Sequence, residues 1–195
     1  MAEIPVILLA AGGSIRMGRP KQLLNWDNKT LIEHQIETIR KTGNRLFVVL
    51  GAYSEAIIPL IEKKGVEIII NNRWQSGMGS SISEGFSGAV KLVPDADGIM
   101  ITLTDQPLIP AEHYKNLITK FQPGRQNIIV SASGKVHSGA PVVFDKYYFP
   151  ELKSLAGDKG ARTVIELHKH NVITVECERI LDDLDTTEDY VRLLN

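Results

Sequence analysis

The 195-residue chain carries 22 Lys and Arg against 23 Asp and Glu, so its formal net charge is only -1. Without a net positive field, neither nucleic acid nor an anionic membrane is an expected partner. Cys177 is the only cysteine, which excludes an internal disulfide framework and thiolate zinc clusters. Hydrophobic residues make up 43% of the chain, and no run approaches the roughly 20 apolar residues of a membrane helix. We therefore expect one domain over residues 1–195, located in a reducing cytoplasm.

Short apolar runs bounded by Gly, Asn or Asp predict buried parallel strands. These runs are Ile4–Leu9, Leu46–Leu50, Val66–Ile70, Gly98–Leu103 and Asn127–Val130. Between them, the spacing of apolar residues predicts helices over Thr30–Thr42, Ser54–Lys64, Ser80–Lys91 and Pro110–Phe121. This alternation predicts an α/β fold, a Rossmann-like three-layer sandwich with a mostly parallel central sheet. Ligands in such folds bind at the carboxyl ends of the strands.

The last third of the chain alternates less regularly. Its pattern predicts strands over Pro141–Phe144 and Val172–Cys177, and helices over Lys159–His168 and Thr186–Leu194. The acidic residues of the segment Asp182–Asp189 therefore fall at the amino terminus of the last predicted helix.

A glycine-rich segment with three cations, Arg16, Arg19 and Lys21, follows the first predicted strand. Glycines let main-chain amides approach phosphate oxygens, and the cations neutralise phosphate charge. A P-loop is excluded because Arg19 and Pro20 stand where it requires Lys and then Ser or Thr, and the dinucleotide pattern GxGxxG is absent. The alternative is a solvated turn with surface cations, but the position directly behind a buried strand favours phosphate binding.

The run LAAGGSIRMGRPKQLL, Leu9–Leu24, closely resembles the signature of the MobA-like nucleotidyltransferases, and within them the molybdenum cofactor cytidylyltransferases. The resemblance implies a fold of the nucleotide-diphospho-sugar transferase type, with the loop wrapped around a triphosphate and phosphate contacts from Arg16 and Lys21. The Ala-Ala-Gly opening implies CTP. The implied nucleotide-binding residues of this loop are Leu9, Ala10, Ala11, Gly12, Gly13, Ser14, Arg16, Met17, Gly18 and Lys21.

Asp105 ends an otherwise apolar strand, where a buried carboxylate needs a partner. Mg²⁺ prefers one or two carboxylates together with substrate phosphate oxygens, although an Asp before a turn can also serve as a cap. The segment Leu103–Pro107 resembles the LTDQP segment of the family, which implies magnesium binding by Asp105 and a catalytic role shared with Arg16 and Lys21.

A second acidic cluster, Asp182–Asp189, precedes the final predicted helix. Asp185 or Thr186 with Glu188 or Asp189 forms a plausible helix cap. The stretch also resembles the DIDTxED ending of the family, which implies that Asp185 lies near the metal. Both roles stay open for Asp185.

The segment Asn71–Ile82 places hydroxyl groups at a predicted helix start, where free amides attract anions. Capping by Ser80 or Ser81 is one explanation. Resemblance to the GMxxSL segment of the family implies nucleotide contacts from Gly77, Met78, Ser80 and Ser81. Trp74 and Met78 fit the core as well as a site.

Two later segments, Ser138–Phe144 and Leu155–Arg162, correspond to the acceptor side in the family, although GDKG is also an ordinary tight turn. Ala140 stands where family members often carry His or Asn. The implied acceptor-binding residues are Gln106, Gly139, Pro141, Gly157, Asp158, Gly160 and Arg162.

The resemblance spans Val6 to Asp189 and implies transfer of CMP from CTP to the terminal phosphate of molybdopterin, with release of pyrophosphate. Implied partners are CTP, a pterin phosphate and a molybdoenzyme of the xanthine dehydrogenase type. Two rivals remain: transfer to a sugar phosphate or another small phosphate, and a noncatalytic carrier of the pterin cofactor. Mere carriage needs no triphosphate site, so the loop and Asp105 favour an enzyme.

Overall fold

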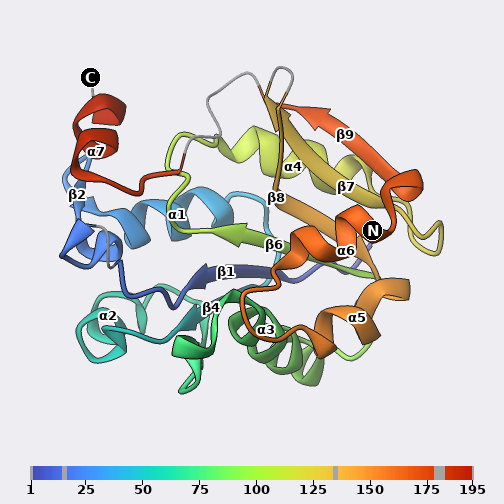
Figure 1. Cartoon of the computed structure of the whole chain (residues 1–195), viewed down its shortest axis with the longest axis horizontal. Coiled ribbons are helices and arrows are strands. Elements are labelled where there is room, and N and C mark those ends of the chain that lie inside the picture. Colours follow the sequence, from blue (N-terminus) through green and yellow to red (C-terminus); the bar gives the residue numbers. More distant parts are fainter. Residues whose placement is uncertain (1, 15–16, 134–135, 178–182, 195) are drawn as a thin grey trace.

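A single seven-stranded sheet forms the centre of the computed structural model, which describes residues 2–14, 17–133, 136–177 and 183–194, with 136–138 described by their backbone alone. Across the sheet the strands are β5 (Glu67–Ile70), β4 (Leu46–Leu50), β1 (Val6–Ala10), β6 (Gly98–Leu103), β8 (Val136–Asp145), β7 (Ile128–Ser133) and β9 (Val172–Glu176). Every neighbouring pair is parallel except the two that β8 makes, with β6 and β7 (Figure 1). Only two residues separate β7 from β8, and so short a connection joins antiparallel strands. The predicted mostly parallel α/β sheet is confirmed.

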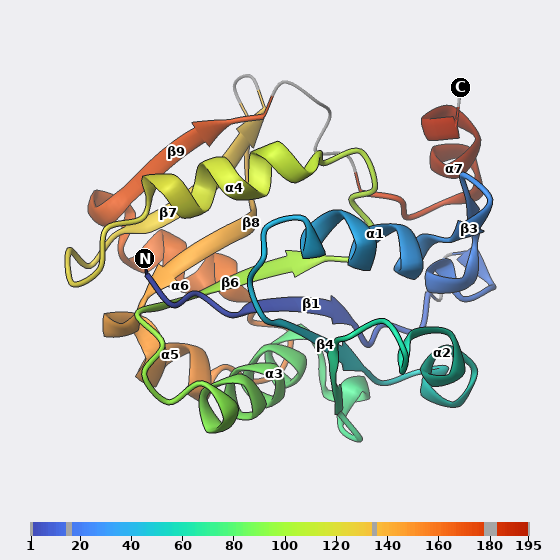
Figure 2. The ribbon, with the colours of Figure 1, turned by 180° about the vertical axis from the view of Figure 1, so that it is seen from behind.

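Helices cover both faces of the sheet. One face carries α1 (Leu31–Arg40), α2 (Ser54–Ile61) and α4 (Ala111–Lys120); the other carries α3 (Met78–Leu92), α5 (Phe149–Ser154) and α6 (Ala161–Leu167). Figure 2 has α1 and α4 in front of the sheet, and Figure 1 has α6 in front. Because side chains alternate along a strand, Val6 and Leu8 enter one core while Ile7 and Leu9 enter the other.

Local chemistry explains two of these helices. The Thr30 side chain accepts from the Glu33 N–H, and the Glu33 carboxylate accepts from the Thr30 N–H, so α1 begins with a capping box. Helix α3 lies close to the sheet because a Cβ on Gly85 would stand 2.6 Å from Val49 Cγ2. That close approach holds the α3 amino terminus at the same edge as the end of β1.

The C-terminal segment folds back against the segment that follows the glycine-rich loop. The hairpin of β2 (Asn25–Trp26) and β3 (Lys29–Thr30) lies beside α7 (Thr187–Leu194) in both views (Figures 1 and 2). Tyr190 donates from its hydroxyl to the Asn25 carbonyl at 2.5 Å. Leu184 joins the apolar cluster beneath them, which also contains Met17, Leu24, Trp26 and Leu31. The acidic segment thus reaches the loop, although Asp185 lies 164 residues beyond Lys21 in the sequence.

The structure also differs from the sequence prediction in places. The helix predicted from Ser80 begins at Met78, with Gly77 as its N-cap, so neither Ser80 nor Ser81 is the cap. The short helix α5 and the β2–β3 hairpin were not predicted, nor were the 3-10 turns η2 (Lys21–Leu23), η3 (Trp74–Ser76), η4 (Lys146–Tyr148) and η5 (Lys169–Asn171). None of the helices among the described residues has the length and apolar character needed to cross a lipid bilayer.

Candidate active site

A cavity of about 450 Å³ lies at the carboxyl ends of β1 and β6. Its wall contains the sequence-predicted residues Leu9, Ala10, Ala11, Gly12, Gly13, Lys21, Gly77, Met78, Ser81, Asp105 and Asp185. Trp74, which the sequence left open between core and site, also lines it, and five further lining residues were not predicted: Gln22, Gln75, Leu103, Thr104 and Asp183. The structure therefore brings together, in one hollow, segments drawn from four distant parts of the sequence.

The glycine-rich loop and Asp105 lie side by side because β1 and β6 are hydrogen-bonded neighbours. Thr104 continues this pairing beyond the strand, since its N–H and its hydroxyl both donate to the Leu9 carbonyl, at 3.2 and 2.8 Å. The next residue, Asp105, lies in the turn after β6 and consequently stands beside the start of the loop.

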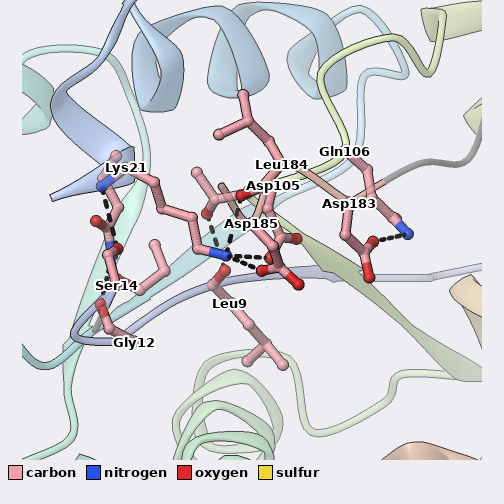
Figure 3. A network of polar contacts seen from close by, with 12 residues as sticks. Leu9, Gly12, Ser14, Lys21, Asp105, Gln106, Asp183, Leu184 and Asp185 are labelled. Carbon is pink, nitrogen blue, oxygen red and sulfur yellow. Dashed lines mark hydrogen bonds and ion pairs between the residues drawn. The ribbon is translucent and has the colours of Figure 1, made fainter. Parts of the chain in front are cut away.

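Lys21 occupies the centre of the polar side of the cavity (Figure 3). Its Nζ lies 2.5 Å from Asp105 Oδ2, 3.2 Å from Asp185 Oδ1 and 3.4 Å from the Leu184 carbonyl. Its own N–H donates to Ser14 Oγ at 3.1 Å, which fixes the start of its side chain. Burial acts to lower the pKa of Lys21, but the two carboxylates outweigh burial and raise that pKa above its usual value. Lys21 is therefore a fully charged cation shared by two acids.

Asp185 is delivered to the cavity by the C-terminal segment. The Leu184 N–H donates to the Asp105 carbonyl at 2.8 Å, which anchors this segment to the end of β6. The cap of α7 is made by its neighbours: Thr186 Oγ1 accepts from the Asp189 N–H, and Asp189 Oδ2 accepts from the Thr186 N–H. Of the two roles left open for Asp185, its side chain makes the contact with Lys21, while Thr186 and Asp189 form the cap.

The carboxylates of the cavity provide some, but not all, of the ligands that a hard divalent cation needs. Asp105 Oδ1 is buried and has no hydrogen-bond partner among the described residues, so it holds an unused lone-pair site. Asp105 and Asp185 already share one cation, the Lys21 ammonium. The described residues contain no group of three or more His, Cys, Asp or Glu that could hold a metal ion by itself. A metal here would need substrate oxygens to complete its ligands, as Mg²⁺ sites commonly do.

A third carboxylate, Asp183, was missed as a site residue. Gln106 is buried and donates from Nε2 to Asp183 Oδ1 at 3.0 Å (Figure 3). Burial, followed by repulsion from Asp105, raises the pKa of Asp183. Only the spacing of two residues from Asp185, which puts both side chains of an extended segment on the same side, would have pointed to it. Gln106, predicted to bind the acceptor, lies behind Asp183 rather than in the cavity wall.

The opposite wall comes from η3 and the start of α3. The Trp74 ring packs over the loop, since a Cβ on Gly13 would stand 3.1 Å from it. Ser81 faces the cavity, whereas Ser80 is turned into its own loop, where its single O–H has the carbonyls of Arg73 and Gly77 within reach, at 3.0 and 2.8 Å from Oγ. Trp74 is thus a wall of the site, and Ser80 holds the turn before α3.

Several predicted loop residues lie away from the cavity. Met17 is buried in the apolar cluster with Leu24 and Leu184, and Gly18 is exposed in a turn with a positive φ of 67°. Ser14 supports Lys21 from behind. Arg16 lies outside the described residues.

The predicted acceptor residues are divided among different surroundings. The turn at Gly157–Asp158 packs on the cavity rim, because a Cβ on Gly77 would stand 2.4 Å from the Gly157 carbonyl carbon, and Gly160 lies against Met78. Gly157 also lines a hollow of about 470 Å³ behind the rim. Gly139 and Arg162 instead line a separate cavity of about 620 Å³, where α6 meets the sheet. Pro141 is buried in β8, and its carbonyl accepts from Ser131 Oγ at 2.7 Å.

The family model described as the MobA-like NTP transferase domain matches residues 6–172. The chain belongs to the MobA-like NTP transferase family. This match confirms the family resemblance of the loop, and MobA-like membership makes the chain a nucleotidyltransferase whose specific substrate is not established by the match.

The similar MobA-like relatives carry different names. Nicotine blue oxidoreductase of Paenarthrobacter nicotinovorans is 33% identical, over 96% of this chain and 95% of that protein. Purine catabolism protein PucB of Bacillus subtilis is 29% identical, over 94% and 92%. Molybdenum cofactor cytidylyltransferase of Escherichia coli is 22% identical, over 98% and 95%. The molybdenum cofactor branch therefore stays a prediction.

Among solved structures, Rv0371c of Mycobacterium tuberculosis has a TM-score of 0.85 and 28% identity, covering 99% of this chain and 98% of that one. A second structure of Rv0371c, with a TM-score of 0.82 and 27% identity over the same shares of the two chains, is a complex with manganese. A protein with the same fold thus binds a divalent metal.

Proposed function

We propose that the chain transfers CMP from CTP to the terminal phosphate of molybdopterin, a pterin phosphate, and releases pyrophosphate. One observation carries this proposal: the same cavity holds the glycine-rich loop and Lys21, whose ammonium group lies between the carboxylates of Asp105 and Asp185. The sequence resemblance of the Ala10–Gly12 opening supports CTP, and the name of the E. coli relative supports the pterin acceptor.

The loop is the proposed triphosphate site. The N–H groups of Gly12 and Gly13 make no hydrogen bond to any described group, and both residues line the cavity. Free main-chain amides of this kind bind phosphate oxygens. Lys21, charged and 16% exposed, then supplies the positive charge, with Arg16 as the second proposed cation.

Asp105 and Asp185 are the proposed ligands of Mg²⁺. When bound, this ion would neutralise the negative charge of the phosphates and of the departing pyrophosphate. No covalent nucleophile is needed, because phosphoryl-type transfer relies on in-line positioning and charge neutralisation. A terminal acceptor phosphate forms the new bond to the α-phosphorus, and the bond from that phosphorus to the pyrophosphate oxygen breaks. Lys21 stays protonated throughout and moves its contacts from carboxylates to phosphate.

The acceptor is proposed to enter over the rim formed by Gly77 and the Gly157–Gly160 turn, which touch each other. Asp158, Arg162 and Gln106 keep their proposed acceptor-side roles. Gly139 and Arg162 line a different cavity, so within this proposal they contact the part of the acceptor farthest from the reacting phosphate.

The test is pyrophosphate release in a mixture of CTP, Mg²⁺ and molybdopterin, compared with GTP and ATP and with sugar phosphates as acceptors. Lys21→Glu is expected to abolish release, because it sets a third acid against Asp105 and Asp185. Lys29→Glu is the matched control, since Lys29 pairs with Glu37 on the surface. An unchanged rate in Lys21→Glu would refute the phosphate role of Lys21. Release with a sugar phosphate alone would transfer the proposal to that acceptor, and cofactor binding without release would favour the carrier.

An oxidoreductase activity is the second candidate, and the name of the P. nicotinovorans relative favours it. The cavity wall speaks against it, since a lysine and three acids suit a cation and a polyphosphate better than a hydride donor. Reduction of a heteroaromatic dye by NADH or NADPH in the presence of the chain, without pyrophosphate release, would replace the proposed transfer.

A further inference from the structure

Gln22 is a buried amide next to the central lysine. It lies in η2 directly after Lys21 and is only 1% exposed. Its Nε2 donates two hydrogen bonds, both of 2.9 Å, to the carbonyls of Ala10 and Gly12. An amide nitrogen has two N–H donors, so both are used on the main chain of the glycine-rich loop.

These two bonds determine how the loop faces the cavity. Successive carbonyls of an extended chain point in alternate directions, so Ala10 and Gly12 present their oxygens to the same side, where Gln22 lies. With those oxygens tied down, the N–H groups of Gly12 and Gly13 have no partner among the described residues. Carbonyl oxygens turned into the cavity would repel phosphate, whereas free N–H groups attract it.

The carbonyl oxygen of the same amide lowers the stability of the fold. Gln22 Oε1 is buried and has no hydrogen-bond partner among the described residues. A buried acceptor without a partner opposes folding, which offsets part of the stability that the two Nε2 bonds contribute. The amide is therefore placed for its two Nε2 bonds, which set where the carbonyls of Ala10 and Gly12 point.

We propose that Gln22 is a positioning residue for polyphosphate, holding the carbonyls of Ala10 and Gly12 away from the ligand. This inference rests on the proposed function, because it assumes that the loop binds the triphosphate. It concerns a residue that itself need not touch the nucleotide, and whose effect grows with the number of phosphates bound.

The experiment measures the affinity of Gln22→Leu for CMP, CTP and inorganic tripolyphosphate in the presence of Mg²⁺, together with the melting temperature. We expect tripolyphosphate and CTP to bind about tenfold more weakly, which corresponds to about 1.4 kcal/mol, with a smaller loss for CMP. The melting temperature should fall, because the carbonyls of Ala10 and Gly12 lose their donor. Gln22→Glu, which sets an oxygen against both carbonyls, should lose more affinity than Gln22→Leu.

Asn44→Leu is the matched control. Its Nδ2 donates to the Ile4 carbonyl at 2.8 Å, just before the opposite end of β1, so it removes a similar amide bond to the main chain away from the cavity. We expect it to leave polyphosphate affinity unchanged. Equal losses for CMP and tripolyphosphate in Gln22→Leu, or no loss, would overturn the inference while the unsubstituted chain still bound tripolyphosphate. Failure of the unsubstituted chain to bind tripolyphosphate would overturn the proposed function and this inference together.

Discussion

The cavity at the ends of β1 and β6 and the cavity under α6 are built differently. In the first, the charged groups are fixed by the main chain: Leu184 anchors to Asp105, and Ser14 anchors Lys21. In the second, the charged groups lie on a helix surface, where Arg162 pairs with Glu166 and is 83% exposed. Fixed, partly buried charges interact strongly, whereas exposed pairs contribute little.

The difference follows from topology. Parallel strands deliver their carboxyl ends, and the loops that follow them, to one edge of the sheet. The second cavity instead opens between a face of the sheet, at Val130, Val172 and Thr174, and the side of α6. A site at strand ends gathers main-chain donors and acids, while a site on a sheet face gathers mostly side chains. We therefore expect substitutions in the first cavity to dominate the chemistry.

Asp105→Asn should have the largest effect. It keeps the shape of the side chain but removes the charge that lies 2.5 Å from Lys21 Nζ. We expect the rate of pyrophosphate release to fall about 10²–10³-fold, the size of the loss when one preorganised electrostatic contact to a transition state is removed. Asp97→Asn, at the amino end of the same strand, is the control. A similar loss of rate in both variants would contradict the view that charges at the carboxyl ends of the strands matter more for the reaction than charges elsewhere in the fold.

Lys21→Met should separate metal binding from phosphate binding. Without the ammonium, Asp105 and Asp185 lose the cation that they share, so Mn²⁺ added without nucleotide should bind about tenfold more tightly. CTP should bind more weakly, by about 100-fold, because a charge-assisted contact is lost. Calorimetric titrations with Mn²⁺ alone and with CTP provide the two affinities. Weaker Mn²⁺ binding in this variant would contradict the view that Lys21 competes with the metal.

Glu33→Gln tests a charge outside both cavities. Hydrogen bonds from the Thr30 N–H and hydroxyl, followed by Lys64, lower the pKa of Glu33 from 4.5 to about 2. A lowered pKa means that the ionised form stabilises the fold above pH 4.5, and that this stabilisation is lost as the pH falls toward 2. The substitution should reduce the free energy of unfolding by about 1–2 kcal/mol at pH 7.

Urea unfolding of Glu33→Gln and the unsubstituted chain from pH 7 to pH 3 checks this. The two curves should converge as the pH falls, and pyrophosphate release by the folded variant should be unchanged. A constant difference across that range would mean that Glu33 acts through packing rather than through its charge.

The buried strands were predictable because burial on both faces leaves a continuous apolar run. Leu46–Leu50 and Gly98–Leu103 match β4 and β6 to the residue. Asp105 followed as the polar residue at the end of such a run. The helix α5 was missed since Phe149–Ser154 is too short for a helical period to appear, and η4 leads directly into it.

Which residues of the site line the cavity could not be predicted in the same way. Ser80 and Ser81 differ by one position, about 100° around α3, and the helix start fixes which of them meets the cavity. Trp74 becomes a wall only because Gly13 and Gly51, distant in sequence, leave room for its ring. Tertiary packing determines the roles of these serines and of Trp74, and no local sequence pattern indicates it.

Of the three substitutions within the two cavities, Arg162→Ala should have the smallest effect on catalysis. Arg162 is 83% exposed and its Nε bonds to Glu166 one turn later on α6, so solvent screens its charge. If Arg162 contacts the far part of the acceptor, the KM for molybdopterin should rise about threefold, with the KM for CTP and the kcat unchanged. Steady-state rates at varied acceptor and fixed CTP measure this. A fall in kcat as large as that of Asp105→Asn would place Arg162 at the reacting phosphate and remove the distinction between the two cavities.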